Sequence, residues 1–176
     1  MHFTPLENAL VSLRKLERKD FDALFQVASD PVIWKDHPDF TRYTSEGFKI
    51  YFEHLLNTNY PLIVIDKNSN KVIGATSYYE HNPQEKSIAI GYTFLAMSHR
   101  GGKFNRSMKQ LMIDYAFQYV NQIIFHVRSS NFRSQAALHK TGARKTKEYP
   151  LPSDPNSIQY VYGIDKKEYL TSSALH

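Results

Sequence analysis

The chain of 176 residues contains no cysteine, and this absence narrows the chemistry open to it. Disulfide bonds, thiolate nucleophiles and zinc sites built on cysteine are excluded, which suits a reducing compartment. No apolar run approaches the roughly 18 residues of a membrane-spanning helix, and the N-terminal stretch lacks the basic and apolar regions of a signal peptide. We therefore expect a cytoplasmic protein that does not associate with membranes.

The residues that are present indicate one folded domain. Hydrophobic residues make up 41% of the sequence and include twelve Tyr and eleven Phe, a composition typical of a globular core rather than of disorder. We expect a single domain over residues 1–176, with its core at about 11–169. The net charge of +5 favours an anionic partner, which could be a phosphorylated cofactor, an RNA or an acidic protein surface.

Hydrophobic periodicity and turn residues predict the order of the secondary-structure elements. The predicted elements are a strand at 11–16, helices at 20–28 and 45–57, strands at 62–66, 71–79 and 88–97, a helix from about 104, a strand at 123–128, a short helix at 131–141, and strands at 143–149 and 158–164. Strands 88–97 and 123–128 should be parallel because a helix connects them. We expect an α/β (α+β) fold with a mixed, mostly antiparallel sheet of six to seven strands, about four helices and a central parallel pair.

The loop after the first helix brings together Trp34, Asp36 and His37. One interpretation is a wall that faces a substrate. The commoner arrangement is a tryptophan packed into the core beside ordinary polar loop residues, and we favour it.

The stretch 88–119 is organised as a strand, a basic turn and a helix. The turn at 98–103 contains two glycines and two cations, and Lys103, Arg106 and Lys109 occupy the start of the helix, where acidic residues are usual. Because helix N-termini present unpaired N–H groups and the positive end of the helix dipole, these cations predict a bound anion.

The same stretch resembles the acetyl-CoA signature of the GNAT (GCN5-related N-acetyltransferase) superfamily, in which a splayed strand leads into a glycine turn and a helix. Arg100 and Gly101 match the first positions of that signature, whereas Lys103 and Asn105 stand where glycines are usual. The turn is most similar to the ribosomal-protein N-acetyltransferase branch, in which Asn-x-x-x-Lys follows; here these residues are Asn105 and Lys109.

Residues 131–143 resemble a second element of the superfamily, in which an asparagine at a strand end bonds the pantetheine arm of the cofactor. That residue is Asn131 here, and it can also cap a short helix that Gly142 ends. Leu138 stands where many relatives carry a tyrosine that acts as a general acid.

The resemblance implies a binding site for acetyl-CoA, with the pantetheine arm paired to the open edge of the splayed strand and an N–H of that strand donating to the acetyl oxygen. The residues that it assigns to the cofactor are Phe94, Leu95 and Ala96 on the strand edge, Arg100, Gly101, Gly102, Lys103, Phe104, Asn105 and Arg106 in the turn and first helical turn, and Asn131 and Ser134.

The general base is harder to identify from the sequence. Relatives often carry a glutamate at the position of Ala89, and Glu80 or His81 at the end of the preceding strand is the nearest alternative. Further candidates are Tyr79, Tyr92, His99 and Ser129. We expect Glu80 to be the base and Ser134 to protonate the leaving group, directly or through water, whereas a histidine in mid-strand such as His126 is usually structural. No metal site is predicted.

Three hypotheses follow from these patterns. The leading one is an acetyl-CoA-dependent N-acetyltransferase acting on an amine, which could be a protein N-terminus, a ribosomal protein or a small molecule. The alternatives are a catalytically weak protein that binds CoA and a basic RNA- or ribosome-binding module. Nucleic acid is the less favoured partner because the aromatic residues recur at core spacings. A homodimer is open.

Overall fold

The computed structural model describes residues 3–35, 37, 39–100 and 102–173, with side chains described as far as residue 171. Gly101 and Asp36, which the sequence singled out, lie outside the described residues. The strands are β1 (Leu6–Glu7), β2 (Val11–Lys15), β3 (Tyr60–Asp66), β4 (Lys71–Asn82), β5 (Ser87–Leu95), β6 (Gln122–Arg128), β7 (Arg144–Leu151) and β8 (Asp154–Asp165). The α-helices are α1 (Phe21–Ala28), α2 (Ser45–Leu56), α3 (Lys103–Ala116), α4 (Phe132–His139) and α5 (Lys166–Ser173), and four 3₁₀ turns are η1 (Arg18–Asp20), η2 (Pro31–Ile33), η3 (Phe40–Tyr43) and η4 (Met97–His99).

The strands form a sheet in the order β1-β2-β3-β4-β5-β6-β8-β7, in which only β5 and β6 pair in parallel. This confirms the mixed, mostly antiparallel sheet with a central parallel pair. The described part of the chain has eight strands rather than six to seven, and five α-helices rather than about four. The additional strand β1 has two residues, too few to show an alternating pattern, and α5 follows β8 without an intervening turn.

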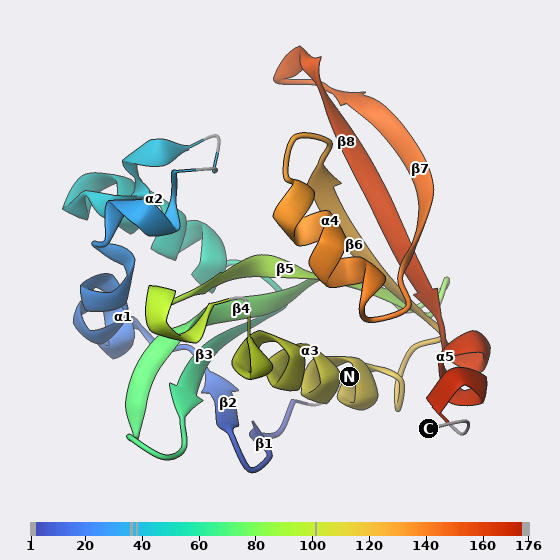
Figure 1. Ribbon diagram of the computed structural model, residues 1–176, viewed down its shortest axis with the longest axis horizontal. Coiled ribbons are helices and arrows are strands. Elements are labelled where there is room, and N and C mark those ends of the chain that lie inside the picture. The colour runs from blue at the N-terminus through green and yellow to red at the C-terminus, as the bar shows by residue number, and fades with distance from the viewer. Residues whose placement is uncertain (1–2, 36, 38, 101, 174–176) are drawn as a thin grey trace.

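Strands β5 and β6 diverge soon after they begin. They pair only from Ser87 to Ala89 on β5 and from Gln122 to Ile124 on β6. In Figure 1, β5 then turns toward α1 and α2 while β6 continues beside β8. The splayed parallel pair that the family resemblance implied is therefore present.

A β-bulge accompanies this divergence. Ser77 pairs with Gly91, and Ala75 pairs with Phe94. The two paired positions are therefore three residues apart on β5 but only two residues apart on β4. Tyr92 within the bulge has a φ of 52°, which is unusual for a bulky residue. Bulges bend a strand and redirect its backbone groups. Residues 91–94 consequently leave the regular ladder where β6 moves away.

Helices cover both faces of the sheet and create two hydrophobic cores. Helix α3 buries Met108 and Met112 in one core, as its spacing predicted, whereas Tyr119 on the same predicted face is 43% exposed. Helices α1 and α2 form the other core, which includes Trp34 and Phe94. No helix in the described ranges is both long and apolar enough to cross a membrane.

Candidate functional site

A cavity of about 290 Å³ opens where β5 and β6 diverge. Its floor is the bulged part of β5, and its walls come from β6, the start of α3, helix α4, and the segment from η2 to α2. The lining residues are Ile90, Gly91, Tyr92, Thr93, Phe94 and Leu95 on β5; Phe125, His126 and Val127 on β6; Arg100, Asn105 and Lys109; Arg133, Ser134, Ala137 and Leu138; and Trp34, His37, Arg42 and Tyr51.

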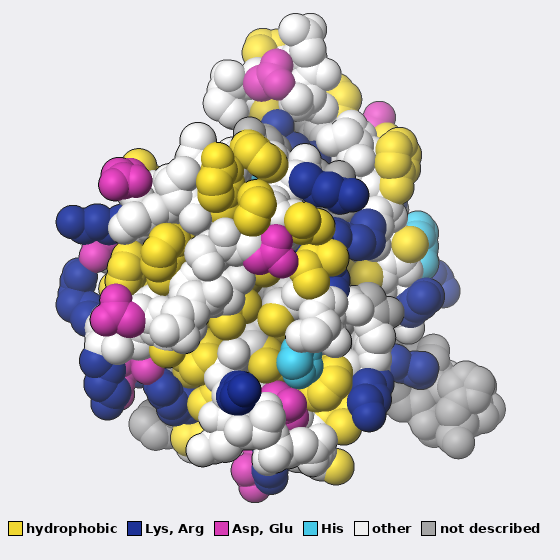
Figure 2. All heavy atoms as spheres, turned by 60° about the vertical axis from the view of Figure 1, so that its left-hand side comes forward, with side chains coloured by type: hydrophobic (Ala, Val, Ile, Leu, Met, Phe, Trp, Pro, Cys, Tyr) yellow, Lys and Arg dark blue, Asp and Glu magenta, His cyan; other side chains and the backbone are white. Residues whose placement is uncertain are grey.

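The charged side chains that line the cavity are all basic. They are Arg42, Arg100, Lys109 and Arg133, joined by two histidines, and no Asp or Glu lines the cavity among the residues described. Figure 2 shows the face bearing α1 and α2, where Lys and Arg side chains gather beside a run of hydrophobic ones. Such a site attracts anions and disfavours polycations.

The N-terminus of α3 is prepared for an anion. Its N-cap is Gly102, no side chain caps the helix, and the first turn contains no acidic residue. A Cβ placed on Gly102 would meet nothing within 4 Å, so a ligand can reach the backbone there. These features fit the phosphates of acetyl-CoA. The exposed Lys103 and Arg106 lie at this helix start, outside the cavity wall, and Phe104 packs on His99 with ring centres 4.5 Å apart.

Arg100 is engaged with the neighbouring loop. Its Nη2 donates to the carbonyl of Ile33 at 2.5 Å and its Nη1 to that of Val32 at 3.4 Å. Arg100 therefore connects the basic turn to η2 by hydrogen bonds. It also lines the cavity. Its assignment to the cofactor phosphates stays a prediction.

Two of the three residues of the predicted strand edge, Phe94 and Leu95, line the cavity, and Ala96 does not. The cavity is lined by Ile90 to Leu95, whereas the N–H of Ala96 donates to the carbonyl of Ile73 at 2.7 Å and so belongs to the sheet. The side chain of Phe94 is buried in the core, with its ring centre 5.0 Å from that of Trp34. Only the backbone of Phe94 can therefore serve a ligand.

At the start of α4, Asn131 has the predicted capping role. Its Oδ1 accepts the N–H of Ser134 at 3.0 Å, and its amide nitrogen has no acceptor within the described ranges. Asn131 does not line the cavity, whereas Ser134 and Leu138 do. The amide donor can therefore still bond a ligand without loss of the cap.

Lys109 lines the cavity and has a lowered pKa, neither of which the Asn-x-x-x-Lys pattern predicted. Its Nζ donates to Thr93 Oγ1 at 2.9 Å and lies 5.8 Å from the ring centre of Phe125, which is buried. Desolvation lowers the pKa of Lys109 from 10.5 to about 7. The lysine is therefore divided between its charged and neutral forms near pH 7.

His126 meets two residues of β4 at the cavity wall. Its Nδ1 lies 2.8 Å from Tyr79 Oη and 3.9 Å from Glu80 Oε2. Burial raises the pKa of the Tyr79 hydroxyl above its ordinary value, so this hydroxyl stays protonated. The other ring nitrogen, Nε2, has no partner in the described part of the chain. We had expected a structural role for His126, because nothing in the sequence pairs it with Tyr79.

Gly91 permits this contact across β5. A Cβ on Gly91 would lie 2.8 Å from Cε1 of Tyr79, so only glycine leaves room for the tyrosine to reach β6. Glu80 itself has a side chain that is 63% exposed and does not line the cavity. Glu80 thus contacts the cavity wall through His126, and its role as a base stays a prediction.

The other base candidates lie elsewhere, with one exception. His99 Nε2 is 3.4 Å from Asp66 Oδ2, and the ring of His81 packs on Tyr60. Neither these histidines nor Ser129 lines the cavity, whereas Tyr92 does. Ala89, at the position of the family glutamate, is fully buried.

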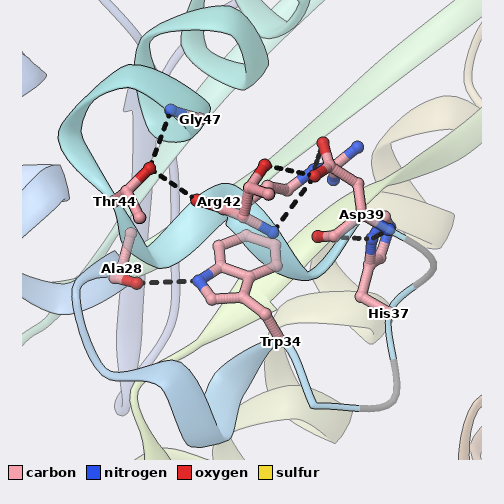
Figure 3. Close-up of polar contacts among 8 residues, drawn as sticks. Ala28, Trp34, His37, Asp39, Arg42, Thr44 and Gly47 are labelled. Atoms are coloured by element: carbon pink, nitrogen blue, oxygen red, sulfur yellow. Dashed lines mark hydrogen bonds and ion pairs between the residues drawn. The ribbon is translucent and has the colours of Figure 1, made fainter.

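An aromatic wall closes the side of the cavity next to α2. Figure 3 shows the Trp34 indole donating to the carbonyl of Ala28, at 2.7 Å, with Arg42 and His37 nearby. The Arg42 guanidinium lies 4.7 Å from the ring centre of Tyr51 and 5.5 Å from that of Trp34. Trp34 is 3% exposed, which confirms the favoured interpretation of a tryptophan packed into the core. It also lines the cavity, and a wall that faces a substrate stays a prediction.

Comparison with known proteins agrees with this architecture. The family model described as the acetyltransferase (GNAT) domain matches residues 11–144. The uncharacterized N-acetyltransferase p20 of Bacillus licheniformis is 26% identical over 172 residues, which cover 90% of this chain and 94% of that protein.

Solved structures share the fold. A GCN5-related N-acetyltransferase from Brucella melitensis matches with a TM-score of 0.79 and 19% identity, over 94% of this chain and 80% of its own. Spermidine N-acetyltransferase from Vibrio cholerae, solved in complex with CoA and spermine, matches with a TM-score of 0.68 and 21% identity, over 93% and 99% of the two chains.

Proposed function

Because this chain belongs to the GNAT superfamily and therefore transfers an acetyl group from acetyl-CoA to an amine, we propose that its acceptor is an α-amino group or another amine of low pKa, which attacks directly in a ternary complex. The observation that carries this proposal is the position of a histidine at the cavity wall, where it can accept a proton. That histidine is His126, held by Tyr79 and Glu80, with no carboxylate lining the cavity among the described residues.

His126 supports this role through its geometry. With a proton on Nδ1, directed to Tyr79 Oη and near the Glu80 carboxylate, Nε2 keeps a lone pair that can accept a proton from the amine. Glu80 then orients and stabilises the charged imidazole instead of contacting the amine. The predicted glutamate thus keeps a function in the proposal, as a positioning residue.

The pKa of the acceptor amine determines how strong a base the site needs. With reference pKa values of about 7.7–8.0 for an α-amine and 10.4 for lysine, roughly one α-amine in ten is neutral at pH 7, against about one lysine in 2,500. The difference is worth about 3 kcal/mol, a substantial part of what catalysis supplies. A histidine suffices for the first acceptor, whereas a lysine side chain would need a stronger base.

The remaining roles belong to groups around the cavity. The N-terminus of α3, with Arg100 and Arg106 nearby, would hold the phosphates, and Asn131 would bond the pantetheine arm. When bound, acetyl-CoA supplies the acetyl thioester. The backbone N–H groups of the β5 bulge are the candidates for donating to the acetyl oxygen, an interaction worth about 2.7–4 kcal/mol in other enzymes.

Two side chains can hold the proton that the leaving sulfur requires. Ser134 lines the cavity and would act directly or through water. Lys109 is the second candidate, because an ammonium with a pKa of about 7 is a stronger acid than a thiol with a pKa of about 8.5. Leu138 at the usual tyrosine position cannot contribute.

The test compares two matched peptides, one with a free N-terminus and blocked lysines, the other with a blocked N-terminus and one free lysine. We expect kcat/KM at pH 7 to favour the free N-terminus by more than about tenfold, and the preference to shrink as the pH rises. Resemblance to the ribosomal-protein branch is in keeping with this acceptor, and a ribosomal-protein N-terminus is one peptide to include.

Variants separate the base from its positioning residue. His126→Gln should lower kcat by about 100-fold or more, and Glu80→Gln by less. Gly91→Ala, which displaces Tyr79, should act in the same direction as His126→Gln. A preference for the lysine peptide at pH 7, or activity abolished by Glu80→Gln but retained by His126→Gln, would contradict the proposal.

A further inference from the structure

The feature that extends this function is a pair of hydrogen-bond donors on the aromatic wall, Arg42 and His37. We propose that they bind a carboxylate of the acceptor, so that the acceptor is a small amine that also carries a carboxylate, as an α-amino acid does. In water the carboxylate of a free amino acid raises the pKa of its ammonium group above that of a peptide α-amine, and pairing the carboxylate with Arg42 offsets this effect in the cavity. This inference rests on the proposed function, because it takes the acceptor to enter the same cavity.

Arg42 is held in place with part of its guanidinium free. Its Nε donates to Asp39 Oδ2 at 3.2 Å, and the group is packed against the rings of Tyr51 and Trp34. The side chain is only 20% exposed, and neither Nη atom has an acceptor in the described part of the chain. A planar guanidinium presents two parallel N–H groups that match a carboxylate. The Nη edge therefore offers such a fork to the cavity.

His37 supplies a second donor beside it. The N–H of Asp39 lies 3.0 Å from Nδ1 of His37, and the carbonyl oxygen of Asp39 lies 3.2 Å from the same nitrogen. In the tautomer in which Nδ1 accepts from the Asp39 N–H, the ring proton lies on Nε2. Burial, with the charge of Arg42, lowers the pKa of His37 to about 4, so the ring is neutral at pH 7. In that tautomer the Nε2–H has no acceptor within the residues described, and His37 lines the same cavity.

The aromatic wall that holds Arg42 is hydrogen-bonded to the β5 bulge. The hydroxyl of Tyr51 donates to the carbonyl of Tyr92 at 2.6 Å, and Tyr92 lies in the β5 bulge. Among the other cavity cations described here, Arg100 is bonded to the carbonyls of η2, Lys109 is bonded to Thr93, and Arg133 is exposed on α4. Arg42 differs from them because it is packed on the rings of Tyr51 and Trp34. A ligand held by Arg42 would thus be fixed relative to the bulge, where the donor is expected.

Charge and size agree with this assignment. The cavity has basic residues and, in the described ranges, no acidic one, so a polyamine would meet repulsion that a carboxylate would relieve. The spermidine enzyme of Vibrio cholerae shares the fold at 21% identity, which does not transfer its acceptor. At about 290 Å³, the cavity is at the lower end of ligand pockets, which are roughly 300–1,000 Å³. A small acceptor therefore fits better than a bulky one.

Trp34 provides a binding assay that does not depend on catalysis. It is the single tryptophan of the chain, and its ring contacts Arg42. We would titrate the protein with N-acetyl-leucine and with N-isopentylacetamide, which is the same amide without the carboxylate, and follow tryptophan fluorescence. We expect a saturable change with the first ligand only, lost in Arg42→Gln and kept in the control Arg18→Gln, whose exposed arginine pairs with Glu53.

Arg42→Lys keeps the charge but not the planar fork, so it should restore only part of the response. Thermal unfolding checks that each variant is folded. An equal response to both ligands, or a response to N-acetyl-leucine that Arg42→Gln leaves intact, would overturn the proposal.

The activity arm compares four amino acids, alanine, leucine, phenylalanine and glutamate, with their decarboxylated amines, together with spermidine and an alanine peptide carrying a free or amidated C-terminus. We expect the amino acids to be the better acceptors. Arg42→Gln should lower their kcat/KM roughly 10- to 100-fold, mainly through KM, the range for a charge-assisted hydrogen bond. The decarboxylated amines and the affinity for CoA should not change. The peptide pair shows whether a peptide carboxylate can replace that of a free amino acid.

The outcomes also separate this inference from the proposed function. If no amine releases thiol but N-acetyl-leucine still binds through Arg42, the proposed function fails and the carboxylate site stands. A preference for spermidine or for the decarboxylated amines would overturn the carboxylate site and leave acetyl transfer intact. A loss of CoA affinity in Arg42→Gln, with the acceptor KM unchanged, would assign Arg42 to the donor and also overturn the inference.

Discussion

Replacing Lys109 with methionine removes an ammonium group that the fold holds away from water. The residue is half-buried, with Nζ between Thr93 Oγ1 and the ring of Phe125, and desolvation lowers its pKa from 10.5 to about 7. Lowering the pKa by about 3.5 corresponds, at roughly 1.36 kcal/mol per pKa unit, to a free-energy difference of about 5 kcal/mol between the charged and neutral lysine. The protonated lysine therefore destabilises the folded protein by up to this amount.

The pH dependence of this cost has a definite sign. Below about pH 7 the lysine is charged in both the folded and the unfolded state, and the full cost applies. Between about pH 7 and pH 10.5 the folded protein releases the proton while the unfolded chain keeps it. The free energy of unfolding should therefore rise with pH across this window, by up to about 1.36 kcal/mol per pH unit from this group.

Methionine is expected to stabilise the protein at pH 7 and to remove this pH dependence. The lost hydrogen bond to Thr93, worth about 1 kcal/mol, and the partial access of Lys109 to water reduce the gain, so we expect a net increase of about 1–3 kcal/mol. In a domain of this size, each kcal/mol raises the Tm by about 2–4 °C. The measurement is urea unfolding followed by circular dichroism, for both proteins at several values between about pH 6 and pH 10.

A matched control is Lys71→Met, since Lys71 is exposed on β4 and its replacement should leave the pH profile parallel to that of the unmodified protein. Parallel profiles for Lys109→Met as well, or a loss of stability at pH 7, would refute the reasoning about desolvation. The same variant should lower kcat if Lys109 protonates the leaving sulfur. A Lys109→Met variant that is more stable but less active would show that the buried ammonium group destabilises the fold and takes part in catalysis.

Two further predictions concern the cofactor site. Gly102→Val should weaken CoA binding about tenfold or more in calorimetry by blocking the approach to the α3 backbone, with Gly102→Ala intermediate. The added atoms meet open space, so only the poorer N-cap propensity of Val and Ala should lower the Tm, by about 2–4 °C. Unaltered affinity would remove the phosphates from this turn. Asn131→Asp keeps an equally good cap for Ser134 but replaces the amide donor with a charge, so steady-state kinetics should show a higher KM for acetyl-CoA at an unchanged Tm. A lower Tm with the KM unchanged would leave Asn131 a helix cap only.

Local features of the site were predictable because they depend on neighbours in the chain. The cap of α4 by Asn131 and the absence of acidic residues at the start of α3 were both expected, and the structure confirms them. Such features follow from backbone groups that a nearby side chain satisfies or leaves open. The bulge at Tyr92 was not predicted, because it leaves no signal in a sequence of suitable strand residues. The pantetheine edge next to it stays a prediction.

The sequence by itself determined the order of elements, the parallel central pair and the family resemblance, because hydrophobic periodicity and turn residues act over short distances. Only the tertiary structure brought Tyr79 across Gly91 to His126, placed Arg42 between Trp34 and Tyr51, and enclosed Lys109. These contacts join residues far apart in the chain, so they depend on strand register and on how the helices cover the sheet. The pKa of Lys109 depends further on which side chains exclude water from its ammonium group, and these side chains come together only when the helices pack on the sheet.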